Sequence, residues 1–199
     1  MDRHEERTLV ELAAAGDRNA ASRLIQAHQA SLYAYLLRLS GRPDVAEDVV
    51  QDAFVRVLTN LDRFDPSFRF STWLFTIARR LFVNACQKHK PVYDSDVVGG
   101  YQSRSNEPSW HVAQDEFQVQ ARDAIGLALA ELSEQQREIV ILFHQQDWPI
   151  ANIADHMGMP EGTVKSHLHR GRRKMRRFFE QNQFAGIEIP AFVAEASQE

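Results

Sequence analysis

Residues 149–177, PIANIADHMGMPEGTVKSHLHRGRRKMRR, are the stretch from which the fold of this chain is most readily inferred. The first part predicts a short helix that begins at Pro149, because a first helical position needs no backbone N–H. Gly158 suits a left-handed helix end, and Pro160 prevents the helix from continuing. A second helix then follows over residues 161–177. This order of helix, tight turn and helix predicts a helix-turn-helix.

The second helix of this pair has an apolar side and a basic side. Its apolar side repeats at three- and four-residue steps through Val164, Leu168, Gly171 and Met175. Residues 161–177 contain seven Lys and Arg residues and one Glu. Charge of one sign on the second helix is typical of a recognition helix in the DNA major groove, although a basic face that is only solvated is the alternative. We expect the following residues to lie outside: Lys165, Ser166, His169, Arg170, Arg172, Arg173, Arg176 and Arg177.

Charge is divided unevenly over the rest of the chain. The 199 residues are 44% hydrophobic and 25% charged, which is enough apolar material for one domain or two small ones. Although the formal net charge is only −4, two segments of the chain carry opposite net charge. Residues 44–65 hold six acids and two Arg, whereas residues 68–90 hold five Lys and Arg and no acid. This separation predicts two surfaces with different partners.

The composition also excludes several classes of protein. A single cysteine, Cys86, excludes an intramolecular disulfide framework, and we expect it to be packed rather than redox-active. No run of about 18 apolar residues and no signal sequence is present, so we expect a cytoplasmic protein without a membrane span. No phosphate-binding glycine loop, metal-ligand spacing or nucleophile triad is found. We therefore expect no enzyme activity, no metal and no cofactor.

Hydrophobic periodicity predicts an all-α chain. Asp17 is placed to cap a helix, Gly41 and Pro43 to break it, and Ser133 with Gln136 to form a capping box. The expected N-terminal helices cover residues 9–16, 17–40, 44–62 and 72–88. The expected C-terminal helices cover residues 115–132, a segment that opens at Ser133, and the helix-turn-helix.

Periodicity stops between residues 89 and 114, where Gly, Ser, Pro, Asn and Asp dominate. This composition is typical of a linker, although Tyr101 and Trp110 are suited to anchoring it. We therefore expect two small helical domains joined by a flexible linker. Their expected ranges are 1–88 and 115–180, with the linker at 89–114 and a tail at 181–199.

The expected helix over residues 44–62 has one apolar side and one acidic side. Its apolar side repeats every four residues from Val45 through Val49 and Ala53. The opposite side combines acids and a glutamine with one apolar residue, which favours a protein-docking surface over a face that is only solvated. Its members are Asp44, Glu47, Asp48, Gln51, Asp52 and Val55.

Residues 64–71, FDPSFRFS, interleave three aromatic rings with Arg69. Aromatic rings next to positive charge suit the stacking of single-stranded bases. A hydrophobic connector folded onto the core explains the pattern equally well. The helix after this loop has a polar face of its own, formed by Arg79, Arg80, Asn84, Gln87 and Lys88.

Several motifs together resemble those of extracytoplasmic-function (ECF) sigma factors of the sigma-70 superfamily. They are DVAEDVVQDAFVRVL at residues 44–58, FSTWLFTIAR at 70–79, LSEQQREIVIL at 132–142, and EGTVKSHLHRGRRKMR at 161–176. The resemblance covers about residues 20–88 and 116–177. It implies a transcription initiation factor that binds core RNA polymerase and directs it to promoter DNA, with catalysis left to the polymerase.

The resemblance also implies a role for each candidate residue. The acidic helix would bind the clamp of the largest polymerase subunit through Asp44, Glu47, Asp48, Gln51, Asp52 and Val55. The unstacked minus-10 element would be captured by Phe68, Arg69, Phe70, Arg79, Arg80 and Asn84. The minus-35 element would be read by Thr163, Lys165, Ser166, His169, Arg170 and Arg173. An anti-sigma factor is a further expected partner.

Two other functions remain compatible with parts of the pattern. A stand-alone helix-turn-helix regulator would use the basic helix but would have no need of an acidic docking helix. A sigma mimic that sequesters an anti-sigma factor would need no basic recognition helix, which this chain retains.

Overall fold

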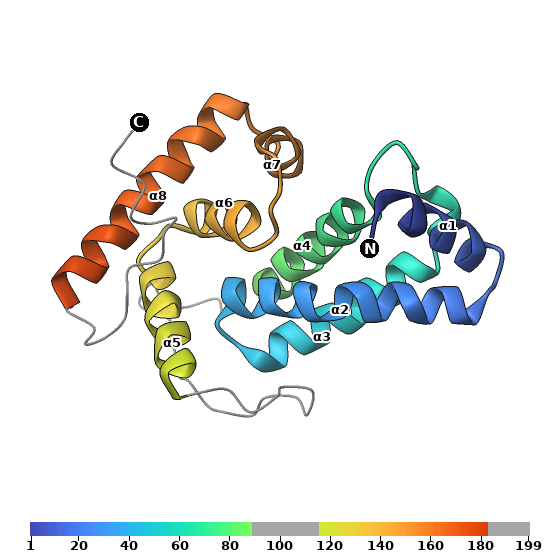
Figure 1. The fold of residues 1–199 in the computed structure, drawn as a ribbon, viewed down its shortest axis with the longest axis horizontal. Helices are drawn as coiled ribbons and strands as arrows, with labels where there is room; N and C mark the ends of the chain where they lie inside the picture. Colours follow the sequence, from blue (N-terminus) through green and yellow to red (C-terminus); the bar gives the residue numbers. More distant parts are fainter. Residues whose placement is uncertain (89–115, 183–199) are drawn as a thin grey trace. The chain divides into compact units, whose positions relative to one another are not determined.

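The computed structural model describes residues 1–88 and 116–182, and all regular structure within those ranges is helical (Figure 1). The chain divides into two compact units, Met1–Val97 and Val98–Glu199. This architecture confirms the expected all-α fold class. The expected linker with Tyr101 and Trp110 lies outside the described residues, as does the tail from residue 183 onward.

The first unit is built around the long helix α2. Its described elements are α1 (Arg3–Ala14), α2 (Arg18–Ser40), α3 (Pro43–Leu58), the 3₁₀ turn η1 (Leu61–Arg63) and α4 (Phe70–Lys88). Helix α2 packs against both α1 and α3, and α3 also packs against α4. The largest fully buried side chains of this core are Leu24, Leu32, Tyr35, Leu36, Phe70, Leu74 and Phe75.

Both ends of α2 follow the sequence prediction. The Asp17 carboxylate accepts hydrogen bonds from the backbone N–H groups of Asn19 and Ala20 at 2.8 and 3.2 Å, so two otherwise unpaired donors are satisfied. At the other end, Gly41 adopts a left-handed conformation with φ of 66°. The predicted boundaries at residues 17–40 are therefore confirmed to within one residue.

Helix α3 is shorter than the predicted 44–62. It ends at Leu58, and the chain continues into the turn η1. The Thr59 hydroxyl donates to the Val55 carbonyl at 2.8 Å, and the Asn60 amide donates to the Arg56 carbonyl at 2.8 Å. These side chains satisfy carbonyls of the last turn and so allow the helix to end there.

Helix α1 leaves Leu12 exposed. The relative exposure of Leu12 is 45%, because the side of α1 that faces inward does not include it. That inward side consists of Glu6, Leu9 and Val10, which are spaced by three and four residues. Cys86 is exposed, so the expectation that it is packed is wrong.

The second unit is assembled around the basic helix. Its elements are α5 (Glu116–Ala130), α6 (Glu134–His144), α7 (Ile150–Met157) and α8 (Glu161–Asn182). Helix α8 packs against the other three. Its approach to α6 is close at Gly171, where an added Cβ would lie 3.0 Å from the Val140 Cγ2 atom. A residue larger than glycine at this crossing would therefore require the Val140 side chain to shift.

The expected caps of the second unit are present. Ser133 and Gln136 form the predicted capping box, with two reciprocal hydrogen bonds of 3.4 Å. Gly158 ends α7 in a left-handed conformation with φ of 65°. Pro149 precedes α7 as its cap instead of forming its first residue. Helix α8 extends beyond the predicted end at residue 177, because Phe179 continues its buried stripe.

Within the described ranges, a membrane-spanning helix is absent because none combines sufficient length with sufficient apolar character.

Candidate nucleic-acid interface

Helix α8 presents the predicted DNA-contacting residues to solvent. Its inward stripe is buried, with Val164 and Met175 fully enclosed. The helical repeat therefore turns the intervening polar positions outward. The recognition face, as we name this set, consists of Thr163, Lys165, Ser166, His169, Arg170 and Arg173, all of which are exposed.

The polar contacts within the recognition face are local and weak. The Ser166 hydroxyl donates to the Gly162 carbonyl at 2.9 Å, and the Arg170 Nε donates to the Ser166 carbonyl at 3.2 Å. The Lys165 ammonium lies 4.0 Å from the Glu161 carboxylate, and both side chains are more than half exposed. Exposed pairs of this kind contribute little to stability. These side chains can therefore exchange their present contacts for DNA at a small cost.

A buried polar pair joins α6 to α7, the first helix of the helix-turn-helix. The Glu138 Oε1 atom lies 3.1 Å from the His156 Nε2 atom, and the side chain of His156 is fully enclosed. The Trp148 indole packs edge-on against His156, with ring centroids 5.3 Å apart. Hydrophobic periodicity did not indicate this pair. The available signal was a single charged residue, Glu138, in the otherwise apolar end of α6.

Arg172 holds α8 against α6 instead of lying on the outer face, where we expected it. Its guanidinium carbon lies 5.3 Å from the centre of the Phe143 ring. Its Nε donates a hydrogen bond of 3.0 Å to the His144 Nε2 atom, which requires a neutral imidazole. Burial, together with the charge of Arg172, lowers the pKa of His144 to about 4.

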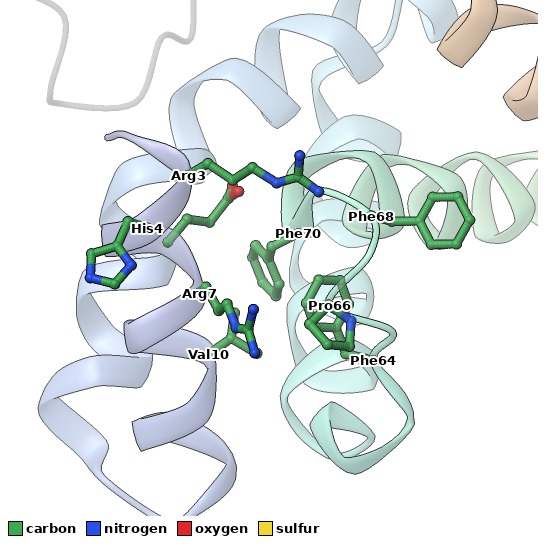
Figure 2. A pocket seen from close by; sticks show the side chains of 9 residues that line it. Arg3, His4, Arg7, Val10, Phe64, Pro66, Phe68 and Phe70 are labelled. Carbon is green, nitrogen blue, oxygen red and sulfur yellow. The ribbon is translucent and has the colours of Figure 1, made fainter.

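In the first unit, residues 64–70 form the aromatic loop between η1 and α4. Phe70 was expected to contact bases, but it is 1% exposed, so that expectation is wrong. Its ring packs against His28, Phe64 and Trp73, with centroids 5.4, 6.0 and 6.3 Å away. Phe68, in contrast, is 56% exposed, and its ring points away from α1 (Figure 2). The loop therefore combines a core anchor with an exposed aromatic ring.

Helix α1 holds the aromatic loop through two polar contacts. The Arg3 guanidinium donates to the Ser67 carbonyl at 2.6 Å. The Arg69 Nε lies 3.6 Å from the buried Glu6 carboxylate, whose other oxygen lies 3.4 Å from the His28 Nε2 atom. Burial raises the pKa of Glu6, but the contact with His28 and the charges of His28 and Arg69 outweigh burial, so the net pKa is lowered. The carboxylate therefore remains ionised at neutral pH.

Helix α4 supplies the remaining residues predicted to contact the minus-10 element. Arg80 and Asn84 are exposed and lie four residues apart, so they share one helix face. Arg79 is partly buried. Arg69, on the preceding loop, has a side chain that is 48% exposed. Arg69, Arg80 and Asn84 are therefore accessible to solvent, and Arg79 is accessible in part.

Helix α3 presents an exposed acidic face on the side away from the core of the first unit. We give this name to the set predicted to bind polymerase, all of whose members are exposed: Asp44, Glu47, Asp48, Gln51, Asp52 and Val55. Val55 is 64% exposed, although Ala53 and Val57 on the same helix are fully buried. An exposed apolar residue among acids is suited to contact with a protein.

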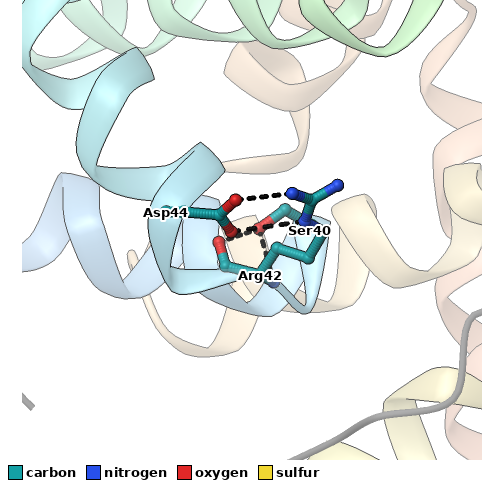
Figure 3. Close-up of polar contacts among 3 residues, drawn as sticks. All are labelled: Ser40, Arg42 and Asp44. Atoms are coloured by element: carbon teal, nitrogen blue, oxygen red, sulfur yellow. Dashed lines mark hydrogen bonds and ion pairs between the residues drawn. The ribbon is translucent and has the colours of Figure 1, made fainter. Parts of the chain in front are cut away.

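Asp44 differs from the other acids of the acidic face because it is already paired. The Arg42 Nε donates to Asp44 at 3.2 Å, and a second guanidinium nitrogen contacts the other carboxylate oxygen (Figure 3). The backbone N–H of Arg42 also donates to the Ser40 hydroxyl at 3.1 Å. The hydrogen bond from Arg42 holds the pKa of the Asp44 carboxyl below its usual value. The charge available to a partner therefore comes mainly from Glu47, Asp48 and Asp52.

Among residues 1–88 and 116–182, no group of three or more His, Cys, Asp or Glu side chains is arranged to hold a metal ion.

Comparison with known proteins covers both units. Residues 24–92 match the family model of Sigma-70 region 2, and residues 122–175 match that of Sigma-70, region 4. Over 168 residues the chain is 30% identical to the ECF RNA polymerase sigma factor SigW of Bacillus subtilis (strain 168). That alignment covers 81% of this chain and 90% of SigW.

Two solved structures are similar in fold. CnrH, in complex with the cytosolic domain of CnrY, has a TM-score of 0.67 at 22% identity, covering 89% of this chain and 99% of that chain. The sigma factor RpoE of Bartonella quintana, in complex with the anti-sigma factor NepR, has a TM-score of 0.62 at 25% identity. This second match covers 81% of the present chain and 97% of that of RpoE.

Proposed function

The chain belongs to the ECF RNA polymerase sigma factors. We propose that three of its exposed surfaces have separate roles in transcription initiation: the recognition face, the aromatic loop with α4, and the acidic face. As a sigma factor it binds core RNA polymerase and directs it to promoter DNA. The observation that carries the assignment of surfaces is the one-sided helix α8, which buries Val164, Leu168 and Met175 and exposes the recognition face. The bond-making chemistry belongs to the polymerase.

The recognition face binds the minus-35 element as duplex DNA. Lys165, Ser166, His169 and Arg170 lie in the first half of α8, the part of a recognition helix that reaches base edges in the major groove. Arg173 lies one turn beyond Arg170 and contacts the phosphate backbone, which gives affinity but no sequence preference.

The aromatic loop and α4 bind the minus-10 element after its bases unstack. Phe68 supplies an exposed ring for base stacking, and Arg69 supplies nearby positive charge. Arg79, Arg80 and Asn84 continue the polar surface along α4. Unstacking a base costs a few kcal/mol, which stacking on Phe68 partly offsets.

The acidic face binds core polymerase. Glu47, Asp48 and Asp52 offer negative charge along one side of α3, with Gln51 among them and Val55 as an apolar contact. A basic surface on the polymerase would be complementary to this arrangement. Because Arg42 already neutralises Asp44, we assign to Asp44 a smaller share of the binding.

An anti-sigma factor is the third partner. The similar RpoE structure is a complex of a sigma factor with the anti-sigma factor NepR, which supports the same class of partner for this chain.

Reconstitution with core polymerase tests the proposed function. The full chain is mixed with core enzyme, separated by gel filtration, and assayed by run-off transcription on promoter fragments selected by the mixture. We expect co-elution and a promoter-dependent transcript. DNA binding that needs no polymerase would instead identify a stand-alone regulator. Binding to an anti-sigma factor without any transcript would identify a sigma mimic.

A further inference from the structure

The exposed middle of the aromatic loop has little packing to hold it in place. Residues 65–69 are all exposed, and they lie between the half-buried Phe64 and the enclosed Phe70. A cavity of about 320 Å³ lies between the loop and α1 (Figure 2). The loop has a local turn, in which the Asp65 carboxylate accepts a hydrogen bond of 2.9 Å from the backbone N–H of Ser67. This turn shapes the loop, but its orientation has to come from contacts with other segments.

The buried carboxylate of Glu6 on α1 meets three other segments where the loop ends. One oxygen, Oε2, lies 3.6 Å from the Arg69 Nε, and the other, Oε1, lies 3.4 Å from the Nε2 atom of His28 on α2. The same carboxylate faces the backbone N–H of Ser71, in the first turn of α4. Negative charge is favourable there, because the first N–H groups of a helix have no partner within the helix. Glu6 therefore joins α1, α2, the loop and the start of α4 at one point.

The contacts from α1 flank Phe68 on both sides. The Arg3 guanidinium donates to the carbonyl of Ser67, the residue before Phe68, and Glu6 approaches Arg69, the residue after it. The Phe68 ring itself remains exposed. A ring on a loop that is already oriented loses less conformational freedom when it binds a partner. The orientation of this loop thus contributes to affinity without adding a contact.

We propose that Glu6 is a positioning residue for recognition of the minus-10 element, and that it orients Phe68 through Arg69 and the first turn of α4 without touching DNA. Helix α1 precedes residues 24–92, the segment that matches Sigma-70 region 2, so that match assigns it no role. This inference rests on the proposed function, in which Phe68 stacks on an unpaired base.

A charge effect of Glu6 would have the opposite sign. A carboxylate close to DNA repels phosphates and offsets the charge of Arg69, so its neutralisation would tighten binding if Glu6 acted only through charge. If Glu6 positions the loop, neutralisation weakens binding. Glu6→Gln separates the two, because it removes the charge and keeps the size. The matched control is Glu5→Gln, whose carboxylate lies 2.7 Å from the Arg23 guanidinium in an exposed pair.

The experiment measures binding of holoenzyme to forked promoter DNA whose minus-10 non-template strand is single-stranded. We expect Glu6→Gln to weaken binding about fivefold, which is within the range for residues coupled in one contact network. Glu5→Gln should leave this binding unchanged. Neither variant should alter assembly with core polymerase or binding to a fully duplex minus-35 fragment.

A double-mutant cycle distinguishes positioning from a general loss of stability. In the Phe68→Ala background, Glu6→Gln should have little further effect, because the ring that Glu6 orients is absent. Circular dichroism checks that the helix content is unchanged. If Glu6→Gln loses helix content, Glu6→Asp replaces it with the same expectation, because the shorter side chain keeps the charge but reaches Arg69 less well.

Two results would overturn the inference. One is unchanged or tighter binding of the forked DNA by Glu6→Gln, and the other is equal weakening in the wild-type and Phe68→Ala backgrounds. If Phe68→Ala alone weakens binding while Glu6→Gln does not, the inference fails and the proposed function stands. If Phe68→Ala binds the forked DNA as the wild type does, the role proposed for Phe68 fails, and the inference fails with it.

Discussion

Glu138 and His156 lie 3.1 Å apart in the interior of the second unit and join α6 to the first helix of the helix-turn-helix. Their side chains are 6% and 0% exposed, so the polar contact between them is shielded from water. Since α7 packs against α8, this pair helps to set the orientation of the recognition face.

Removal of this pair should destabilise the second unit. We expect Glu138→Ala to lower the free energy of unfolding by about 1–3 kcal/mol, because it removes a polar contact of a buried imidazole. Urea unfolding followed by circular dichroism measures the change. The matched control is Glu161→Ala, which removes the exposed pair with Lys165 and should leave the unfolding midpoint nearly unchanged. Equal losses of stability in the two variants would show that the buried pair contributes no more to stability than the exposed pair.

His144 should make stability dependent on pH. Its pKa is about 4 in the folded chain, against an ordinary value of about 6.5, so the unfolded chain binds the proton more tightly. The stability that this group contributes is complete above about pH 6.5 and decreases as the pH falls toward 4. The total loss is at most about 3 kcal/mol, and it is smaller because solvent screens this half-buried side chain. His144→Gln keeps an acceptor for Arg172 but does not titrate. Unfolding measured from pH 7 to 5 should therefore have a shallower pH dependence in this variant.

The two phenylalanines of the aromatic loop should respond differently to truncation. Phe70→Ala should cost about 3–5 kcal/mol of stability, because its ring is enclosed in the core. Phe68→Ala should leave the unfolding midpoint close to that of the wild type, because its ring is exposed. It should weaken binding of the single-stranded minus-10 element by about 1–3 kcal/mol. Wild-type affinity of Phe68→Ala for forked promoter DNA would remove Phe68 from the site.

The acidic face should be needed for assembly with core polymerase. Asp52→Arg should weaken core binding by at least about tenfold, because it places positive charge against a basic partner surface. Gel filtration with core enzyme measures assembly, and circular dichroism checks that the helix content is unchanged. Asp62→Arg is the matched control, since Asp62 is exposed but lies on η1, outside the acidic face. An intact holoenzyme with Asp52→Arg would contradict the assignment.

The recognition face should account for the choice of promoter. Arg170→Ala should reduce discrimination between the correct and altered minus-35 sequences by about 1–3 kcal/mol, the usual contribution of a specific base contact. Arg177→Ala also removes one exposed charge but lies beyond the recognition face. It should weaken binding equally for both sequences, if at all. Run-off transcription from paired templates compares the two variants, and identical profiles would exclude a base-reading role for Arg170.

Local signals in the sequence were sufficient to predict most of the helices. Asp17, Gly41 and Gly158 act through hydrogen bonds and dihedral angles within a few residues of themselves, so their effects did not depend on the rest of the fold. The one-sided pattern of α8 also depends only on the helical repeat, and it correctly separated Val164 and Leu168 from Lys165 and Arg170.

What the sequence by itself determined is therefore the all-α class, the helix-turn-helix and the two faces of α8. Tertiary structure alone decided that Phe70 is enclosed while Phe68 is exposed, that Arg172 packs against α6, and that Glu6 lies beneath the aromatic loop. The physical reason is the distance along the chain over which each kind of interaction acts. Helix caps and periodicity act along a few residues, whereas burial depends on which distant segments meet. The Glu6 carboxylate acquires its role only where α1 meets a loop more than sixty residues later in the chain.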